Sequence, residues 1–109
     1  MTTTVKQLGQ SALSATLTAT LYTTPASTKT IVNEILLCNT DTSARTVTLR
    51  AGASPATAAS ATILSALSLA AGETKFITLS TVLETGHLIT GGASMGSVVS
   101  CTISGVEVV

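Results

Sequence analysis

The sequence predicts an all-β protein, a single-domain antiparallel β-sandwich of jelly-roll-like form with about seven or eight strands. Polar and apolar residues alternate with a period of two from end to end, and no segment carries the apolar stripe of an amphipathic helix. Runs rich in Val, Ile and Thr are separated by turn-forming residues at roughly 8 to 12 positions, a spacing typical of sandwiches and jelly rolls.

The first expected strand covers residues 16–22, where Leu17 and Leu21 alternate with threonines and share a buried face. The sequence Thr-Pro-Ala-Ser at residues 24–27 ends it. Residues 29–39 form the strongest strand, with Ile31, Ile35 and Leu37 on one side and further apolar residues on the other toward its end. A strand that is apolar on both sides belongs in the centre of a sheet.

Residues 39–43 are turn formers whose side chains can bond their own backbone, and residues 45–50 resume the alternation. Together they predict a hairpin. Residues 52–61, GASPATAASA, are small and polar with nothing to bury, which indicates a long exposed loop. Residues 62–70 are expected to form a strand that enters a turn at 71–73, although their spacing also fits a short helix.

The last third of the chain predicts three more strands, at residues 75–79, 87–90 and 98–109. Residues 82–86 are expected to form a turn, and the glycine-rich residues 91–97 a flexible connection. The final segment alternates to its end, so we expect a full strand docked in a sheet.

Two regions follow from this pattern: a β-sandwich domain at residues 15–109, and residues 1–14 before it. The first 14 residues contain few apolar anchors. They form either an additional edge strand or an arm that becomes ordered on a partner.

The composition points to a protein that lives in an assembly. The 109 residues are 45% apolar but only 2% aromatic, so the core must be aliphatic, with Phe76 and Tyr22 as its large rings. Charged residues are 9% of the chain, five basic and five acidic, against roughly 25% in ordinary soluble domains. Near-zero net charge and a mean hydropathy of +0.59 favour association.

Several partners and locations are not expected from this composition. Five scattered basic residues make no patch for a nucleic acid. No apolar stretch approaches the roughly 18 residues of a membrane span, and the first 13 residues do not resemble a signal peptide. We therefore expect neither nucleic-acid nor membrane binding, and no export through the secretory pathway.

The sequence offers no catalytic constellation. Its single histidine, His87, and single aspartate, Asp41, stand in no recognisable motif, whereas a nucleophile needs a neighbouring base. Glycosidases need two placed carboxylates, and the glutamates occur singly, at Glu34, Glu73, Glu84 and Glu107. We expect no enzyme activity, no catalytic or cofactor-binding residue and no cofactor.

Metal sites are not expected either, because neither carboxylates nor Cys and His residues are clustered. Cys38 and Cys101 lie in strand-like runs without a CxxC spacing. We interpret them as buried free thiols. A cross-strand disulfide between them is the alternative.

Six short segments form a recognisable series: LYTTPA at residues 21–26, TIVNEILLCNT at 30–40, TVTL at 46–49, LAAGET at 69–74, LETGH at 83–87 and TISGVE at 102–107. Over about residues 20–109 the chain thereby resembles small β-sandwich proteins of tailed-bacteriophage virions. These proteins include capsid decoration, head-fibre, neck and tail modules. The resemblance implies a non-enzymatic homo-oligomer that binds the capsid or tail lattice.

We therefore expect a capsid decoration or cement protein, located in virions assembled in the host cytoplasm. Its partners are the major capsid protein or another virion protein and further copies of itself, with a trimer as the working assumption. The alternative is a neck, head-fibre or tail-associated module that binds a partner protein or a host-surface glycan. The expected partner contacts, which lie where no core role is apparent, are Thr2, Thr3, Thr4, Lys6, Gln7, Gln10, Ser54, Pro55 and Thr57.

Overall fold

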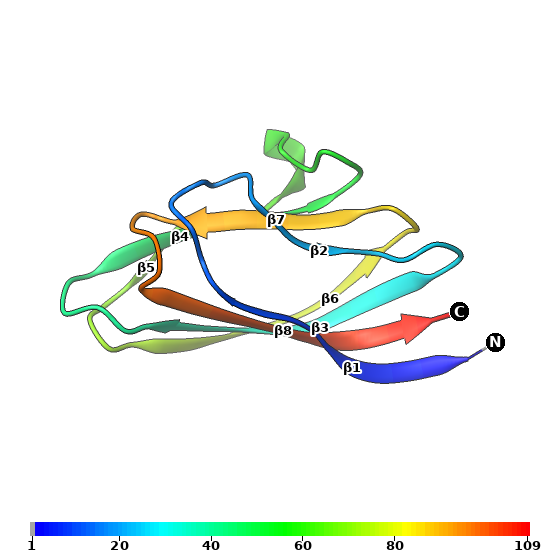
Figure 1. The fold of residues 1–109 in the computed structure, drawn as a ribbon, viewed down its shortest axis with the longest axis horizontal. Coiled ribbons are helices and arrows are strands. Elements are labelled where there is room, and N and C mark those ends of the chain that lie inside the picture. Colours follow the sequence, from blue (N-terminus) through cyan, green and yellow to red (C-terminus); the bar gives the residue numbers. More distant parts are fainter. Residues whose placement is uncertain (1) are drawn as a thin grey trace.

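The structure, a computed structural model, describes residues 2–109 as two four-stranded antiparallel sheets that face each other (Figure 1). One sheet has the strand order β1-β8-β3-β6 and the other β2-β7-β4-β5. The elements are β1 (Thr3–Ala12), β2 (Thr20–Thr23), β3 (Lys29–Asn39), β4 (Arg45–Gly52), the short 3-10 helix η1 (Ala59–Ala61), β5 (Thr62–Leu69), β6 (Thr74–Leu83), β7 (Leu88–Ala93) and β8 (Val99–Val108).

The strands pair in a nested order, in which the first strand of the chain pairs with the last and the pairing continues inward. β1 pairs with β8, β2 with β7, β3 with β6 and β4 with β5. Pairing of β3 with β8 and of β4 with β7 completes the two sheets. An eight-stranded double sheet wound in this way is a jelly roll, so the predicted all-β sandwich is confirmed.

This winding sends most connections from one sheet to the other, which makes the hairpin predicted around residues 39–43 wrong. β3 and β4 lie in different sheets, and the segment between them is a corner. The buried Asn39 shapes that corner: its side-chain amide donates to the carbonyl of Ser43 at 2.9 Å and to those of Leu69 and Ala70 at 3.2 Å. The connection that does join paired neighbours is the loop between β4 and β5.

The core lies between the sheets and is aliphatic, as the composition predicts. Its largest fully buried side chains are Leu13, Val32, Ile35, Leu37, Val47, Leu49, Leu69, Leu83, Ile89, Val99 and Ile103. Of the two expected rings, Tyr22 is 9% exposed and belongs to the core, whereas Phe76 is 66% exposed and does not. The expectation for Phe76 is wrong because its position on β6 points away from the second sheet.

Strand existence is predicted better than strand length. The strand expected at residues 16–22 is the shorter β2, and Leu17 lies 41% exposed in the loop before it. β6 is longer than expected, and it includes Val82 and Leu83 from the predicted turn. β3, β5 and β8 lie where the alternation places them.

The glycine-rich segment is only partly a connection, because Gly91, Gly92 and Ala93 are buried members of β7. A side chain at Gly91 would meet the carbonyl oxygen of Thr48, and one at Gly92 would meet that of Thr16. Glycine is thus needed there for close approach of β7 to its neighbours rather than for flexibility.

A register shift between Val32 and Glu34 changes the buried face of β3. Before the shift Val32 points into the core, and after it Ile35 and Leu37 do. The predicted alternation, which kept Ile31 on the same side as Ile35, is wrong for this reason. A bulge of this kind places one extra residue in a strand, so every later side chain reverses its side.

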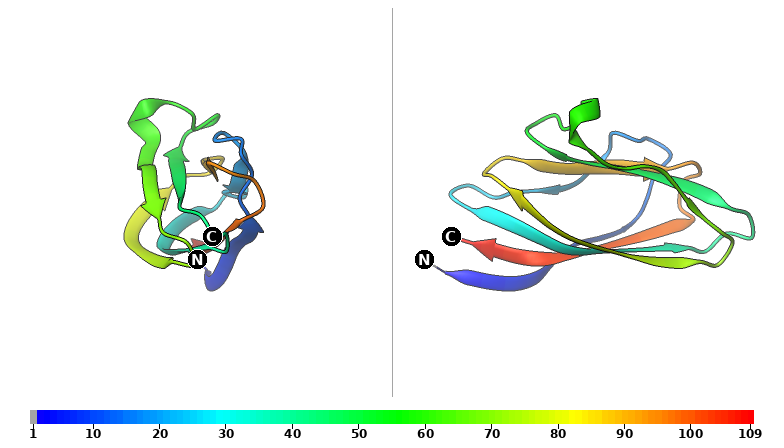
Figure 2. Two further views of the ribbon diagram at one scale, coloured as in Figure 1. Left: turned by 90° about the vertical axis from the view of Figure 1, so that its left-hand side faces the viewer. Right: turned by 180° about the vertical axis from the view of Figure 1, so that it is seen from behind.

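Residues 3–12 form β1, an edge strand that pairs with β8 along its whole length except for a shift near Leu8. The two chain ends meet at one end of the sandwich (Figure 2). Thr2 and Val109 exchange backbone hydrogen bonds of 3.0 and 2.8 Å there.

Candidate interaction surfaces

The expected partner contacts near the N-terminus lie on or beside β1, and all of them are exposed: Thr2, Thr3, Thr4, Lys6, Gln7 and Gln10. The strand divides them between two faces. Gln10 donates to Thr102 at 3.4 Å on the outer face of the sheet. Lys6 lies on the other face, with its Nζ 3.4 Å from Glu107 Oε1. By the register, Thr4 and Lys6 face the inner side of the sheet, while Thr3, Gln7 and Gln10 face outward.

The second expected contact region is the loop between β4 and β5, where Ser54, Pro55 and Thr57 are exposed. The expectation that this loop buries nothing is wrong at Ala56, which is 3% exposed. Its carbonyl oxygen accepts a 2.8 Å hydrogen bond from Thr90 Oγ1 of β7. The loop is thereby tied to the sheet beneath it, and its exposed side chains stand on either side of the tie.

The structure does not bring these two regions together. β1 lies at the edge of the lower sheet in Figure 1, and the loop that contains η1 projects from the upper sheet on the opposite side of the sandwich. The view from behind shows the same separation (Figure 2). A flat partner surface cannot contact both regions of one copy.

The single histidine and the single aspartate also lie apart. Asp41 is at the β3–β4 corner and His87 at the β6–β7 connection, and the pairing of Cys38 with Thr74 and of Thr30 with Leu83 puts these connections at opposite ends of the sandwich. Arg45 holds Asp41, with Nε 2.7 Å and Nη2 2.6 Å from Oδ2. The hydrogen bond from Arg45, helped by the backbone N–H of Thr42, lowers the pKa of Asp41. The Asp41 carboxylate therefore forms an ion pair with Arg45 at the turn.

Neither cysteine is part of a bond or a ligand set. Cys38 and Cys101 are free thiols on neighbouring strands. Cys101 stands opposite the buried Leu37, so Cys38, one position later, points to the outer face. Burial raises the pKa of Cys101 to about 12, which keeps it in the unreactive thiol form. Among residues 2–109, no three His, Cys, Asp or Glu side chains gather as a metal site would require.

A polar cluster ties the two sheets together beside the core. Tyr22 reaches from β2 across the sandwich and donates its hydroxyl proton to Glu107 Oε2 at 2.6 Å, with Thr30 Oγ1 2.8 Å away. Burial and the neighbouring Glu107 carboxylate raise the pKa of Tyr22 to about 12. Lys6 completes the cluster through Glu107. All its polar groups are used by one another, so we assign it a structural role.

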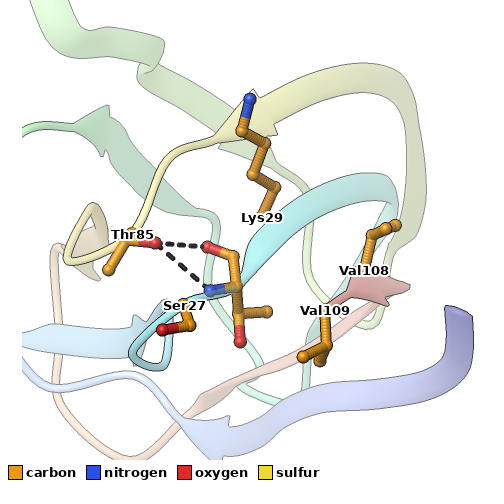
Figure 3. A pocket seen from close by; sticks show the side chains of 6 residues that line it. Ser27, Lys29, Thr85, Val108 and Val109 are labelled. Atoms are coloured by element: carbon orange, nitrogen blue, oxygen red, sulfur yellow. Dashed lines mark hydrogen bonds between the residues drawn. The ribbon is translucent and has the colours of Figure 1, made fainter. Parts of the chain in front are cut away.

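A shallow pocket of about 480 Å³ lies near the chain ends, lined by Ser27, Thr28, Lys29, Thr85, Val108 and Val109 (Figure 3). Thr85 Oγ1 accepts from the Thr28 backbone N–H at 3.2 Å and donates to its carbonyl at 2.8 Å. The polar groups of the pocket thus join two loops to each other. Lys29 points away along the rim and pairs with Glu84 at 3.6 Å.

The surface that the sequence analysis missed is the outer face of the β1-β8-β3-β6 sheet. The register aligns Val5 with Val106, Val106 with Ile31 and Ile31 with Val82, so four aliphatic side chains cross the whole sheet in one row. Val5 is 81% and Val82 54% exposed, and Phe76 lies farther along the same face. We call Val5, Val106, Ile31 and Val82 the aliphatic row.

One signal in the sequence did point to this face. Residues 29–39 are apolar on both sides toward their end, a pattern that predicts a central strand of a sheet. β3 is indeed internal to its sheet. Its outer apolar side chains, however, have no layer above them within residues 2–109.

The nested strand pairing allows comparison with known folds. The chain is similar in fold to a chain of a virus structure. That chain belongs to the structure of infectious bursal disease virus, Gx strain, and it superposes with a TM-score of 0.50 and 15% identity over 97% of this chain. The superposition covers 31% of the viral chain, so this protein spans about a third of its neighbour's length.

A chain from the structure of the Gt strain of the same virus superposes with a TM-score of 0.42 and 11% identity, over 96% of this chain and 31% of that one. No protein-family model and no curated protein sequence matches this sequence. At such low identity the likeness concerns the fold. Within residues 2–109, no helix has the length and apolarity to cross a membrane.

Proposed function

We propose that this protein is a non-enzymatic structural component of a virion. The observation that carries the proposal is the jelly-roll winding of its eight strands, an architecture used by viral capsid domains among others. The likeness to a chain of infectious bursal disease virus supports it at the level of the fold. The low charge content and the exposed aliphatic row are what a subunit of an assembly requires.

Within that role, we infer that the chain is a capsid decoration or cement protein of a tailed bacteriophage. The resemblance of its turn and strand motifs to small phage virion proteins supports this finer assignment. Each contact with the major capsid protein is then weak, and many copies on a repeating lattice add up to firm attachment. A module of the neck, head fibre or tail, with a protein or glycan partner, is the alternative.

The test is to mix the purified protein with capsids stripped of their small proteins, sediment the capsids, and count bound copies per particle on a quantitative gel. Binding that saturates at hundreds of copies, on the order of the number of lattice positions, supports decoration. Saturation at about a dozen copies or fewer transfers the protein to the neck or tail. Absence of binding to capsids and to tails would overturn the virion role.

A further inference from the structure

We propose that the outer face of the β1-β8-β3-β6 sheet is the contact surface for a second copy of this chain, in a two-fold pair whose axis runs along the aliphatic row. The inference rests on the proposed function for its biological meaning, since it names the first step of assembly. Its physical claim concerns the purified protein alone. The proposed function and the two-fold pair can therefore be refuted separately.

The outer face of this sheet is aliphatic along one row. Val5, Val106, Ile31 and Val82 form an uninterrupted aliphatic row across four strands. Around it lie uncharged polar side chains, Thr3, Gln7, Ser104 and Thr78, in the neighbouring register rows. Solvent-exposed sheet faces normally carry polar side chains, so an aliphatic row here marks a surface that a partner covers.

Two charged side chains of β3 lie on either side of the aliphatic row. On the outer face of β3, Lys29 stands two residues before Ile31, in the register row of Val108, and Glu34 stands just beyond the bulge, in the row of Ser104. The two charges thus flank the aliphatic row on opposite sides, each about 7 Å from it along the strand. The two charges stand in mirrored places; the Nζ of Lys29 lies 3.6 Å from Glu84 Oε2 of its own chain, so a second carboxylate over Lys29 would share it with Glu84.

A two-fold axis along the row uses this arrangement. Rotation about it lays β3 over the partner copy's β3 in the opposite direction, so that Lys29 of each copy comes over Glu34 of the other. Both ion pairs then border the apolar centre. An axis parallel to the strands would instead put β3 over β8, with Lys29 over Val108 and Glu34 over Ser104, and would cover the Glu34 carboxylate without a cation, which is costly.

The area of the outer face is close to that of a stable interface. Four strands about 4.8 Å apart and ten residues long make a face of about 19 by 33 Å, or about 600 Å² before side-chain relief is counted. A standard stable interface buries roughly 800 Å² of accessible surface on each partner. Side-chain relief raises the accessible area of the face above its flat value, so a pair that covers the whole face approaches the standard size. Two sheets stacked in this way pack about 10 Å apart.

The experiment is analytical ultracentrifugation of the full chain over a concentration series. Glu34→Lys places two ammonium groups against each other on each side of the row. Lys29→Glu does the same with two carboxylates, and it also removes the ion pair with Glu84 within the chain. Each single variant is expected to raise the dissociation constant of the pair at least tenfold. The double variant Lys29→Glu with Glu34→Lys is expected to return this constant to the wild-type value. Val5→Asp, at a position that is 81% exposed and therefore harmless to folding, puts two carboxylates on the axis and is also expected to give monomers.

The control is Thr57→Glu with Ser60→Glu, which adds the same two units of negative charge on the far side of the molecule and is expected to leave the pair unchanged. Far-UV circular dichroism checks that every variant is folded. A wild-type protein that is monomeric or trimeric overturns the inference, as do single charge variants that remain paired or a double variant that stays monomeric. Capsid binding by a protein that is monomeric in solution would leave the proposed function standing and refute the pair.

Discussion

Asn39 shows how one buried amide can hold a corner of the fold. It is 0% exposed; its Nδ2 serves the carbonyls of Ser43, Leu69 and Ala70, and its Oδ1 accepts from the backbone of Asp41 at 3.0 Å. Asn39→Ala leaves the carbonyl of Leu69 without this donor in a buried site, and removes the partly buried bonds to Ser43, Ala70 and Asp41. We expect the free energy of unfolding to fall by about 2 kcal/mol or more.

Urea denaturation measures this loss, and the same strand supplies the control. Asn33 is exposed at the bulge of β3, so Asn33→Ala is expected to change the free energy of unfolding by less than about 0.5 kcal/mol. Equal effects of the two substitutions would mean that the hydrogen bonds of Asn39 do not hold the corner.

Two buried acids make the fold sensitive to alkali. The pKa of Cys101 rises from 9.0 to about 12, chiefly through burial, and that of Tyr22 from 10.0 to about 12, through burial and Glu107. Between the unfolded and folded values the unfolded chain has lost a proton that the folded chain retains, so stability falls as the pH rises. We expect it to be constant from the neutral range to about pH 9, and then to decline toward pH 12.

Denaturation curves at successive pH values between 7 and 11 test this decline. Cys101→Ala is expected to delay its onset to near pH 10, because Tyr22 is then the remaining group of the two. Tyr22→Phe is expected to make the decline of stability above pH 10 less steep. It is also expected to lower stability at every pH, because Glu107 and Thr30 lose their partner. A steady decline in both variants, identical to the wild type, would contradict the assignment.

Such residue roles are the part of the structure that the sequence predicts least. Tyr22 and Glu107 lie 85 positions apart, and nothing near either residue signals the other. Asp41 is the contrasting case: its role as a turn residue follows from local chemistry, and its partner Arg45 is four positions away.

At the scale of elements, close approach of strands explains where glycine is needed. A methyl group at Gly91 would meet the carbonyl oxygen of Thr48 and the side chain of Leu49 on β4. Gly91→Ala must therefore push β7 away from β4. We expect a loss of about 2 kcal/mol or more in the free energy of unfolding.

Thermal or urea unfolding measures this loss against Gly96→Ala. Gly96 lies in the β7–β8 connection, and its added methyl group would have only Ala15 N nearby, at 3.6 Å. That substitution is expected to be nearly neutral. If both glycines tolerate alanine equally, the segment is the flexible connection that the sequence suggested and not a buried strand.

The elements also show why strands are easier to predict than sheets. The period of two in residues 29–39 and 98–109 is a local signal, and β3 and β8 follow it. The turn formers at residues 39–43 suit a hairpin and a corner between sheets equally well, and only the distant carbonyls of Leu69 and Ala70 decide between them. The bulge in β3 is likewise set by pairing and not by its own residues.

For the whole molecule, the arrangement of surfaces assigns different tasks to the two sides of the sandwich. If paired copies cover the outer face of the β1-β8-β3-β6 sheet, their β4–β5 loops remain free on the far sides (Figure 1). The predicted contacts then separate: Thr3, Gln7 and Gln10 meet the second copy, and Ser54, Pro55 and Thr57 meet the lattice. Both segments lack core positions in the sequence and are therefore predicted together as contacts. Their places on opposite sides follow from the pairing of distant strands, which the local sequence does not show.

Two charge-matched double variants test this division. Ser54→Asp with Thr57→Asp is expected to weaken capsid binding at least tenfold and to leave the sedimentation of the free protein unchanged. Thr3→Asp with Gln7→Asp is expected to weaken the pair, and to weaken capsid binding only as far as two-point attachment is lost. If the second variant abolishes capsid binding while still sedimenting as a pair, the outer face of the sheet contacts the capsid and the assignment of the two surfaces must be reversed.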